Sequence, residues 1–177
     1  DRISLGGPVF DIQKLTSFNG DYIRALNPEQ LLERLKKWML NDETWLKIIP
    51  LARPRLNTLS DLVPMSAYLF ADKTFTDPEL PESLTKDGNK ISELLKIAQW
   101  KLESLAQWDS EAVKACFNVI AEKENIKLKE LMMPFYIVIS GSKVSLPVFE
   151  SMEIIGKDMC IRRLQYALEA MENAGFA

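Results

Sequence analysis

The sequence contains no histidine and only two cysteines, Cys116 and Cys160, among its 177 residues. Without histidine, neither a Ser-His nor a Cys-His nucleophile pair can form, which excludes those classes of covalent catalysis. The cysteines are far apart in the sequence and no acidic cluster has ligand spacing, so we expect no metal site. Each cysteine lies among apolar neighbours, and we interpret both as small buried side chains rather than as a disulfide.

Long apolar runs are also missing. No stretch approaches the roughly 18 apolar residues of a membrane-spanning helix, and the N-terminus lacks a signal-peptide pattern. We therefore predict a cytoplasmic protein that does not bind a membrane. The net charge of −3 and the isoelectric point near 5.2 argue against nonspecific, salt-driven binding to nucleic acid. They leave specific RNA recognition open, because basic residues can gather on one face.

Apolar residues recur at helical spacing along most of the chain, which predicts an all-α fold. The clearest helix start is Asn27-Pro28-Glu29-Gln30, where Asn27 and Gln30 have the spacing of a capping box. Its helix should end near residue 41, and a short helix from Asp11 should be interrupted near Gly20. Further helices are expected over residues 43–52, 58–71, 90–107, 109–124, 146–155 and 157–173. Thr58, with Asp61 three residues later, marks the start of the second of these, and Asp109 is expected to cap the fourth.

The segment 135–141 is β-branched and aromatic, and propensity alone favours a strand there. A lone strand would have no partner for its backbone hydrogen bonds, so we predict a helix. Amphipathic helices also carry the four tryptophans, which we expect to pack in the core. We expect the paired basic residues to lie on solvated helix faces. These are Lys36-Lys37, Lys127 with Lys129, and Arg162-Arg163.

Two arginines, Arg53 and Arg55, flank Pro54 between two expected helices. Pro54 fixes its own φ and disfavours helical geometry at Arg53, which predicts a rigid corner. A guanidinium can bond bidentately to a phosphate or a base edge, or stack on an extruded base. From spacing alone, two solvated surface arginines remain the favoured interpretation.

A second candidate is the turn Ser140-Gly141-Ser142-Lys143-Val144-Ser145, which precedes an expected helix. Backbone N–H groups and hydroxyls in such a turn can bind phosphate. The spacing is not that of a P-loop, and on its own the turn is better explained as a helix cap.

Three segments together resemble the anticodon-binding half of bacterial glutamyl-tRNA synthetases: 18–24, 53–62 and 146–157. The resemblance implies helical, bundle-like anticodon-binding subdomains after a short remnant of the stem-contact region, and a helix that opens at Pro134. The implied divisions are 1–26 for the remnant and 27–85 and 86–177 for the two subdomains.

The resemblance also implies roles for individual residues. Arg55 would contact the third anticodon base, a cytosine, as in the enzymes of this family that discriminate between the tRNAs for Glu and Gln, with Arg53 beside it. The turn at 140–145 would lie next to the anticodon, which makes Ser142 and Ser145 candidates for RNA contact. Relatives commonly carry an arginine two residues after the proline at 134. Here that residue is Tyr136, which can stack on a base but cannot neutralise a phosphate.

The parent protein implied by the resemblance is an ATP-dependent glutamate–tRNA ligase. The His-x-Gly-His and Lys-Met-Ser-Lys-Ser-like signatures of its catalytic half are absent, so we expect the chain to begin just after that half and to be inactive alone. No cofactor is expected in this chain, while ATP and Mg²⁺ would belong to the catalytic half. The expected partner is the anticodon stem-loop of tRNA(Glu), bound by a monomer, and not DNA.

Two alternatives stay open. One is a relative of altered specificity that charges another tRNA, such as tRNA(Gln), which the tyrosine at 136 makes conceivable. The other is a non-catalytic helical interaction domain in which Arg53 and Arg55 are surface residues. The sequence does not decide between a discriminating and a non-discriminating enzyme.

Overall fold

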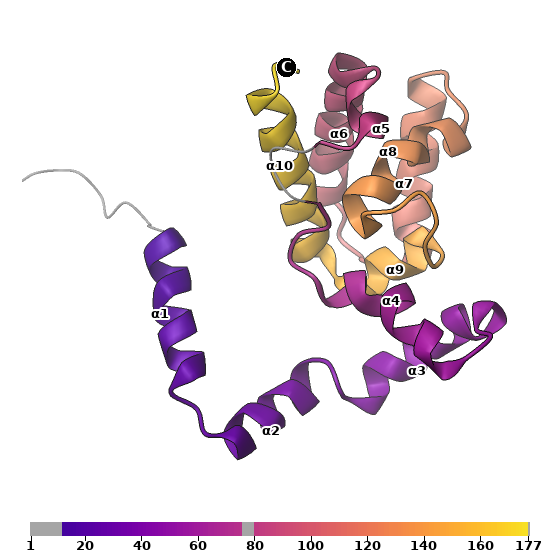
Figure 1. Ribbon diagram of the computed structural model, residues 1–177. Helices are drawn as coiled ribbons and strands as arrows, with labels where there is room; N and C mark the ends of the chain where they lie inside the picture. Colours follow the sequence, from indigo (N-terminus) through magenta and orange to yellow (C-terminus); the bar gives the residue numbers. More distant parts are fainter. Residues whose placement is uncertain (1–11, 76–79, 177) are drawn as a thin grey trace, which may run out of the picture. The chain divides into compact units, whose positions relative to one another are not determined.

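The computed structural model describes residues 12–75 and 80–176, and every regular element within them is a helix. The predicted all-α fold is therefore confirmed (Figure 1). Contacts divide the chain into two compact units, one up to Thr44 and one from Trp45 onward. The expected divisions at 26/27 and 85/86 concern regions of RNA contact, and they stay a prediction.

The first unit contains α1 (Ile12–Arg24) and α2 (Pro28–Trp38). The predicted capping box starts α2: Asn27 Oδ1 accepts from the Gln30 N–H at 2.8 Å, and Gln30 Oε1 accepts from the Asn27 N–H at 3.1 Å. The predicted interruption at Gly20 is wrong, because α1 continues through it. One glycine costs a helix only about 1 kcal/mol relative to alanine, which does not suffice to end it.

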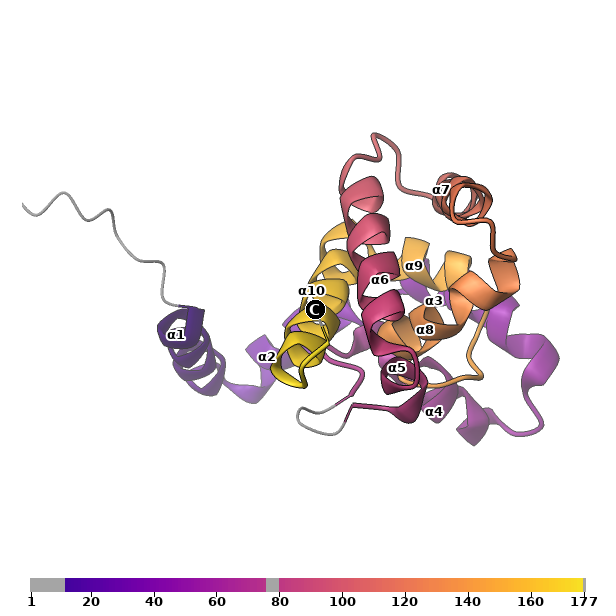
Figure 2. The same ribbon diagram turned by 90° about the horizontal axis from the view of Figure 1, so that it is seen from above.

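The second unit contains most of the helices (Figures 1 and 2). Their bounds are α3 (Asp42–Ala52, which begins in the first unit), η1 (Arg53–Arg55), η2 (Leu59–Asp61), α4 (Leu62–Ser66), η3 (Ala67–Phe70), α5 (Glu82–Thr85), α6 (Gly88–Glu103), α7 (Ser110–Lys123), α8 (Leu128–Ser140), α9 (Val148–Ile155) and α10 (Lys157–Asn173). The single helix predicted over 58–71 is thus a series of three short ones, η2, α4 and η3.

Helices α6 to α10 bury the larger of two apolar cores in this unit, with α6 and α10 side by side (Figure 2). The smaller core is built by Ile48, Ala52, Leu69 and Leu146. It joins α3 to η3 and to Leu146, two residues before α9. This smaller core therefore sits directly beneath the segments that carry the candidate arginines and the candidate turn.

The predicted core placement holds for two tryptophans and is wrong for the other two. Trp45 packs on the smaller core and Trp108 on the larger one, where Trp108 Nε1 donates to Met152 O at 2.9 Å. Trp38 and Trp100 are 60% and 67% exposed. Amphipathic spacing fixes the face of a helix but not whether that face is covered.

Both cysteines carry free thiols, and their burial differs. Cys160 is buried, as expected, and burial raises its pKa to about 12. Cys116 is only partly covered. The prediction of a small buried side chain is therefore confirmed for Cys160 and not for Cys116.

The helical prediction for 135–141 is confirmed, since these residues complete α8 and its cap. The helix begins at Leu128, however, so the expected start at Pro134 is wrong. A proline inside a helix removes one backbone hydrogen bond, whereas α8 buries Leu131, Phe135 and Ile139 fully. Their burial offsets that loss at about 1.5–3 kcal/mol for each side chain.

Gly141 ends α8 in the left-handed region, with φ of +73°. A Cβ there would lie 2.5 Å from the carbonyl oxygen of Thr74. The side chain of Thr74 in turn donates to Val138 O at 2.8 Å. The residues after η3 therefore lie against the end of α8 at a distance that only glycine permits.

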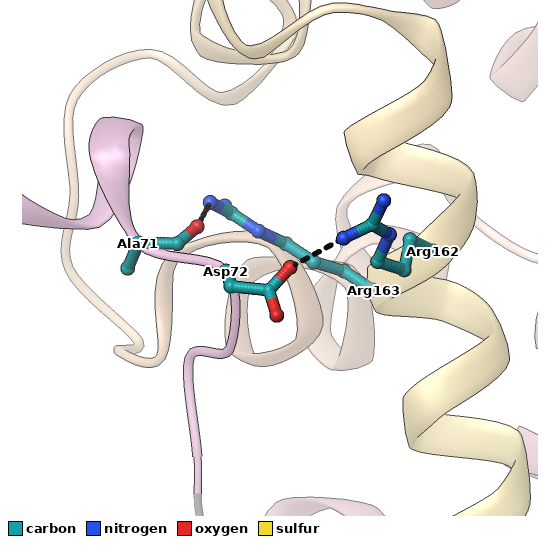
Figure 3. Close-up of polar contacts among 4 residues, drawn as sticks. All are labelled: Ala71, Asp72, Arg162 and Arg163. Atoms are coloured by element: carbon teal, nitrogen blue, oxygen red, sulfur yellow. Dashed lines mark hydrogen bonds and ion pairs between the residues drawn. The ribbon is translucent and has the colours of Figure 1, made fainter. Parts of the chain in front are cut away.

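Arg163 is the largest fully buried side chain, only 2% exposed, so its predicted placement on a solvated face is wrong. Its guanidinium donates to the carbonyl oxygens of Ile139, Tyr68 and Ala71. Arg162, the neighbouring residue, is exposed and pairs with Asp72 at 3.0 Å. Figure 3 shows the two side chains leaving α10 toward the same segment. Burial lowers the pKa of Arg163 from its ordinary value.

These carbonyls belong to the last turn of α8 and to the end of η3. Helix ends leave the oxygens of Ile139 and Ala71 without intrahelical partners, while Tyr68 O also accepts from the Ala71 N–H at 3.3 Å. A cation at helix C-termini also meets the negative end of the helix dipole. Arg163 therefore fastens α8 and η3 to α10 within the second unit.

We predict that Arg163→Met lowers the free energy of unfolding by about 3 kcal/mol, because buried carbonyls lose their donors. Urea denaturation measures the change. The matched control is Arg162→Ala, whose exposed ion pair is worth less than about 1 kcal/mol. Equal losses in the two variants would contradict the role given to Arg163.

We also predict that Gly141→Ala costs more stability than Gly175→Ala. Both glycines have positive φ, at +73° and +89°, so each alanine is disfavoured by about 1–2 kcal/mol. Only at Gly141 does the new Cβ meet a backbone atom, since nothing lies within 4 Å at Gly175. Thermal unfolding of both variants gives the difference, and an equal or smaller cost at Gly141 would contradict the packing described.

Candidate RNA-binding surface

The two candidate arginines lie in η1, the single 3-10 turn that follows α3. The prediction that Pro54 would hold Arg53 out of helical geometry is wrong. The Leu56 N–H closes the turn by donating to Arg53 O at 3.3 Å. Pro54 occupies one of the first two positions of the turn, where its missing N–H is not needed.

Both arginine side chains are exposed. Arg55 Nη1 donates to Leu51 O, at the end of α3, at 2.8 Å. This bond uses one of the five N–H donors of the guanidinium. The bond to Leu51 O thus holds the Arg55 side chain against the end of α3, while the rest of the side chain is exposed to solvent.

The chain directly after η1 is fixed by Asp61. Its Oδ2 accepts from the N–H groups of Asn57 at 2.9 Å and Thr58 at 2.8 Å, and its Oδ1 accepts from Thr58 Oγ1 at 2.9 Å. The predicted helix start with Thr58 and Asp61 is confirmed as a capping box. The backbone hydrogen bond from Thr58, followed by that from Asn57, lowers the pKa of Asp61.

The candidate turn satisfies its own polar groups. Ser140 Oγ donates to Tyr136 O at 2.7 Å and lies 3.0 Å from Ser142 O, while Ser142 Oγ accepts from the Val144 N–H at 3.2 Å. Ser145 Oγ donates to Leu146 O at 2.8 Å. Ser142 is exposed and Ser145 is half-buried. The turn thus has a defined shape with one hydroxyl facing solvent.

Tyr136 is half-buried and packs against the larger core. Its ring contributes to the packing of α8. Core packing is therefore a second explanation for this side chain, beside stacking on a base. The stacking role stays a prediction.

Tyr68 on η3 is linked to α9, the helix that follows the candidate turn, and sequence reasoning missed it. Its hydroxyl lies 2.6 Å from Ser151 Oγ on α9. Burial raises its pKa, while hydrogen bonding to Ser151 and Ser145 and the positive charges of Arg163 and Arg55 act in the opposite direction. Tyr68 and Leu51, whose carbonyl oxygen holds Arg55, both pack on the smaller core that includes Leu146, the neighbour of Ser145. In the sequence, Ala67-Tyr68-Leu69-Phe70 is an apolar helical run, and nothing in it marks the hydroxyl.

The arrangement offers exposed cationic and hydroxyl groups, which suit a polar, anionic ligand. Within residues 12–75 and 80–176, no group of three or more Cys, Asp or Glu side chains is placed to hold a metal ion. No helix in that same part of the chain has the length and apolar character needed to cross a membrane.

The profile of the anticodon binding domain family matches residues 30–168. The glutamate–tRNA ligase of Psychrobacter sp. (strain PRwf-1) is 38% identical over 174 residues, which are 98% of this chain and 34% of that protein. The glutamate–tRNA ligase of Stutzerimonas stutzeri (strain A1501) is 36% identical over 173 residues, 98% of this chain and 35% of that protein. The chain thus spans about a third of the length of these curated relatives.

Solved structures agree on the fold. A crystal structure of glutamate–tRNA synthetase from Elizabethkingia anophelis superposes with a TM-score of 0.60 at 26% identity, over 93% of this chain and 33% of that one. A glutamate–tRNA ligase from Elizabethkingia meningosepticum gives a TM-score of 0.65 at 24% identity, over 93% and 33%.

We predict that the pKa of Asp61 lies below its ordinary value of 3.8 and that Thr58→Ala raises it part of the way back. The substitution removes the hydroxyl bond but keeps both backbone N–H donors. Carboxyl NMR titration measures the pKa. A lowered pKa stabilises the fold above the unfolded pKa, and this contribution is lost as pH falls through the folded pKa. In the control Ser60→Ala, which removes a hydroxyl that contacts Thr58 Oγ1, the Asp61 pKa should stay low. An unshifted Asp61 in the unmodified chain would refute this.

Proposed function

Because the chain belongs to the anticodon-binding domain family, we propose that it binds the anticodon stem-loop of a tRNA. The observation that carries the proposal is the family match over residues 30–168. The exposed Arg55 and the turn at 141–145 belong to segments that the smaller core joins, and they supply a surface of the right chemistry. Guanidinium and hydroxyl groups are donors that unpaired RNA bases and phosphates accept.

We further propose that the whole protein is an ATP-dependent glutamate–tRNA ligase and that its RNA partner is tRNA(Glu). The similarity to glutamate–tRNA ligases over 98% of the chain supports this. ATP and Mg²⁺ would be held by the part of the protein that this chain does not include. The contribution of this chain would be to hold the tRNA in register, so that the acceptor end meets a distant active site. We expect it to act as a monomer.

Arg55 is the residue to which we assign reading of the third anticodon base. Its backbone bond to Leu51 O places it, and its remaining donors suit the O2 acceptor of a cytosine. Arg53, Ser142 and Ser145 would contact the surrounding backbone or bases, and Tyr136 would stack. Such a base contact contributes about 1–3 kcal/mol to discrimination.

The test is a binding titration against anticodon stem-loops that differ only at the third anticodon base, at one fixed salt concentration. We expect the chain to prefer cytosine and Arg55→Ala to lose that preference, at a cost of about 1–3 kcal/mol. Arg162→Ala is the matched control: it removes an exposed arginine that Asp72 holds on α10, and the preference should remain.

Three other outcomes would change the proposal. A preference for guanine would favour a relative of altered specificity, such as one that charges tRNA(Gln). Binding without any preference would retain the anticodon arm as the ligand and remove the role of Arg55. If the chain binds none of the stem-loops, the result would favour a helical interaction domain.

A further inference from the structure

Tyr68 is held at both ends of the residue. Its carbonyl oxygen accepts from Arg163 Nη2 at 2.7 Å, which fastens its main chain to α10. Its side chain packs against the smaller core. A side chain with so little freedom holds its hydroxyl at a defined place.

The direction of the hydroxyl bond follows from counting protons. Ser151 Oγ lies 2.7 Å from Pro147 O, and a carbonyl can only accept, so Ser151 donates its single proton there. At 2.6 Å from the same Ser151 Oγ, Tyr68 must therefore be the donor. One tyrosine proton thus ties η3 to α9.

The segment tied in this way is the one that carries the candidate turn into α9. Ser145 stands at the start of that segment, next to Leu146 of the smaller core, and Ser151 at its far side accepts from the Tyr68 hydroxyl. The charge of Arg55 acts on the same hydroxyl. Arg55 and Ser145 belong to segments far apart in the sequence, and the smaller core joins both: Leu51, which holds Arg55, and Tyr68 pack on the core that contains Leu146, the residue after Ser145.

We propose that Tyr68 is a positioning residue of the anticodon site, whose hydroxyl bond to Ser151 sets the turn that carries Ser145 at a fixed distance from Arg55. This inference rests on the proposed function. Its consequence is that selectivity at the third anticodon base depends on a hydroxyl that need not touch the base, because the base must fit between Arg55 and the turn.

The direct test is Tyr68→Phe, which keeps the ring in the core and removes only the hydroxyl. We expect the ratio of affinities for cytosine and guanine stem-loops to fall about twofold to tenfold, the range for one lost hydrogen bond. Ser151→Ala should lower the same ratio from the other side of the bond. Tyr166→Phe is the matched control, since a phenylalanine retains the ring for the contacts of Tyr166 with Phe75 and Lys73.

A merely structural role predicts a different pattern. It would lower the urea midpoint and leave the affinity ratio unchanged, and this result would overturn the inference while the proposed function stands. An equal fall of the ratio in Tyr166→Phe would overturn it as well. If Tyr68 acts through Arg55, then Tyr68→Phe should change the ratio no further in an Arg55→Ala background. Failure of the unmodified chain to bind any stem-loop would overturn the proposed function and, with it, this inference.

Discussion

The buried guanidinium of Arg163 is the interaction on which the second unit depends. Three carbonyl oxygens from two helix ends converge on it, and those of Ile139 and Ala71 lie where a helix end leaves them without an intrahelical partner. A lysine has three donors on a single nitrogen and lacks the planar fork with which the guanidinium reaches these separate carbonyls. The carbonyl oxygens at the ends of α8 and η3 therefore account for the charged residue in this core. Without it they would face apolar surroundings.

The candidate surface follows from these anchors. The end of α8 leads into the turn at 141–145, and η3 carries Tyr68, so the carbonyls bound by Arg163 adjoin the two segments that meet at the tyrosine hydroxyl. The smaller core then joins α3, and with it Arg55, to the same place. RNA recognition through flexible side chains gains affinity when the groups are already in position, because less freedom is lost on binding. A polar surface held by a buried cation meets that condition.

Local signals in the sequence predicted much of the fold. The capping boxes at Asn27 and Thr58 and the cap at Asp109 each depend on residues within one turn, and the structure has all three. The failures involve partners that lie far away in the chain. Arg163 looks like any helix-surface arginine until η3 and α8 supply carbonyls, and Trp100 looks like a core residue although its face of α6 is exposed. Arg55 and Ser142 were found by resemblance, and Tyr68 was not found, because its hydroxyl partner Ser151 is 83 residues away.

The central claim is that Arg55 and the turn at 141–145 act as one RNA-binding surface. The most direct measurement is a titration of the isotope-labelled chain with an anticodon stem-loop, followed by amide NMR signals. We predict that the signals of Arg55, Ser142 and Ser145 shift together, with one dissociation constant. Shifts confined to the exposed faces of α6 and α7, with Arg55 and the turn unchanged, would contradict it.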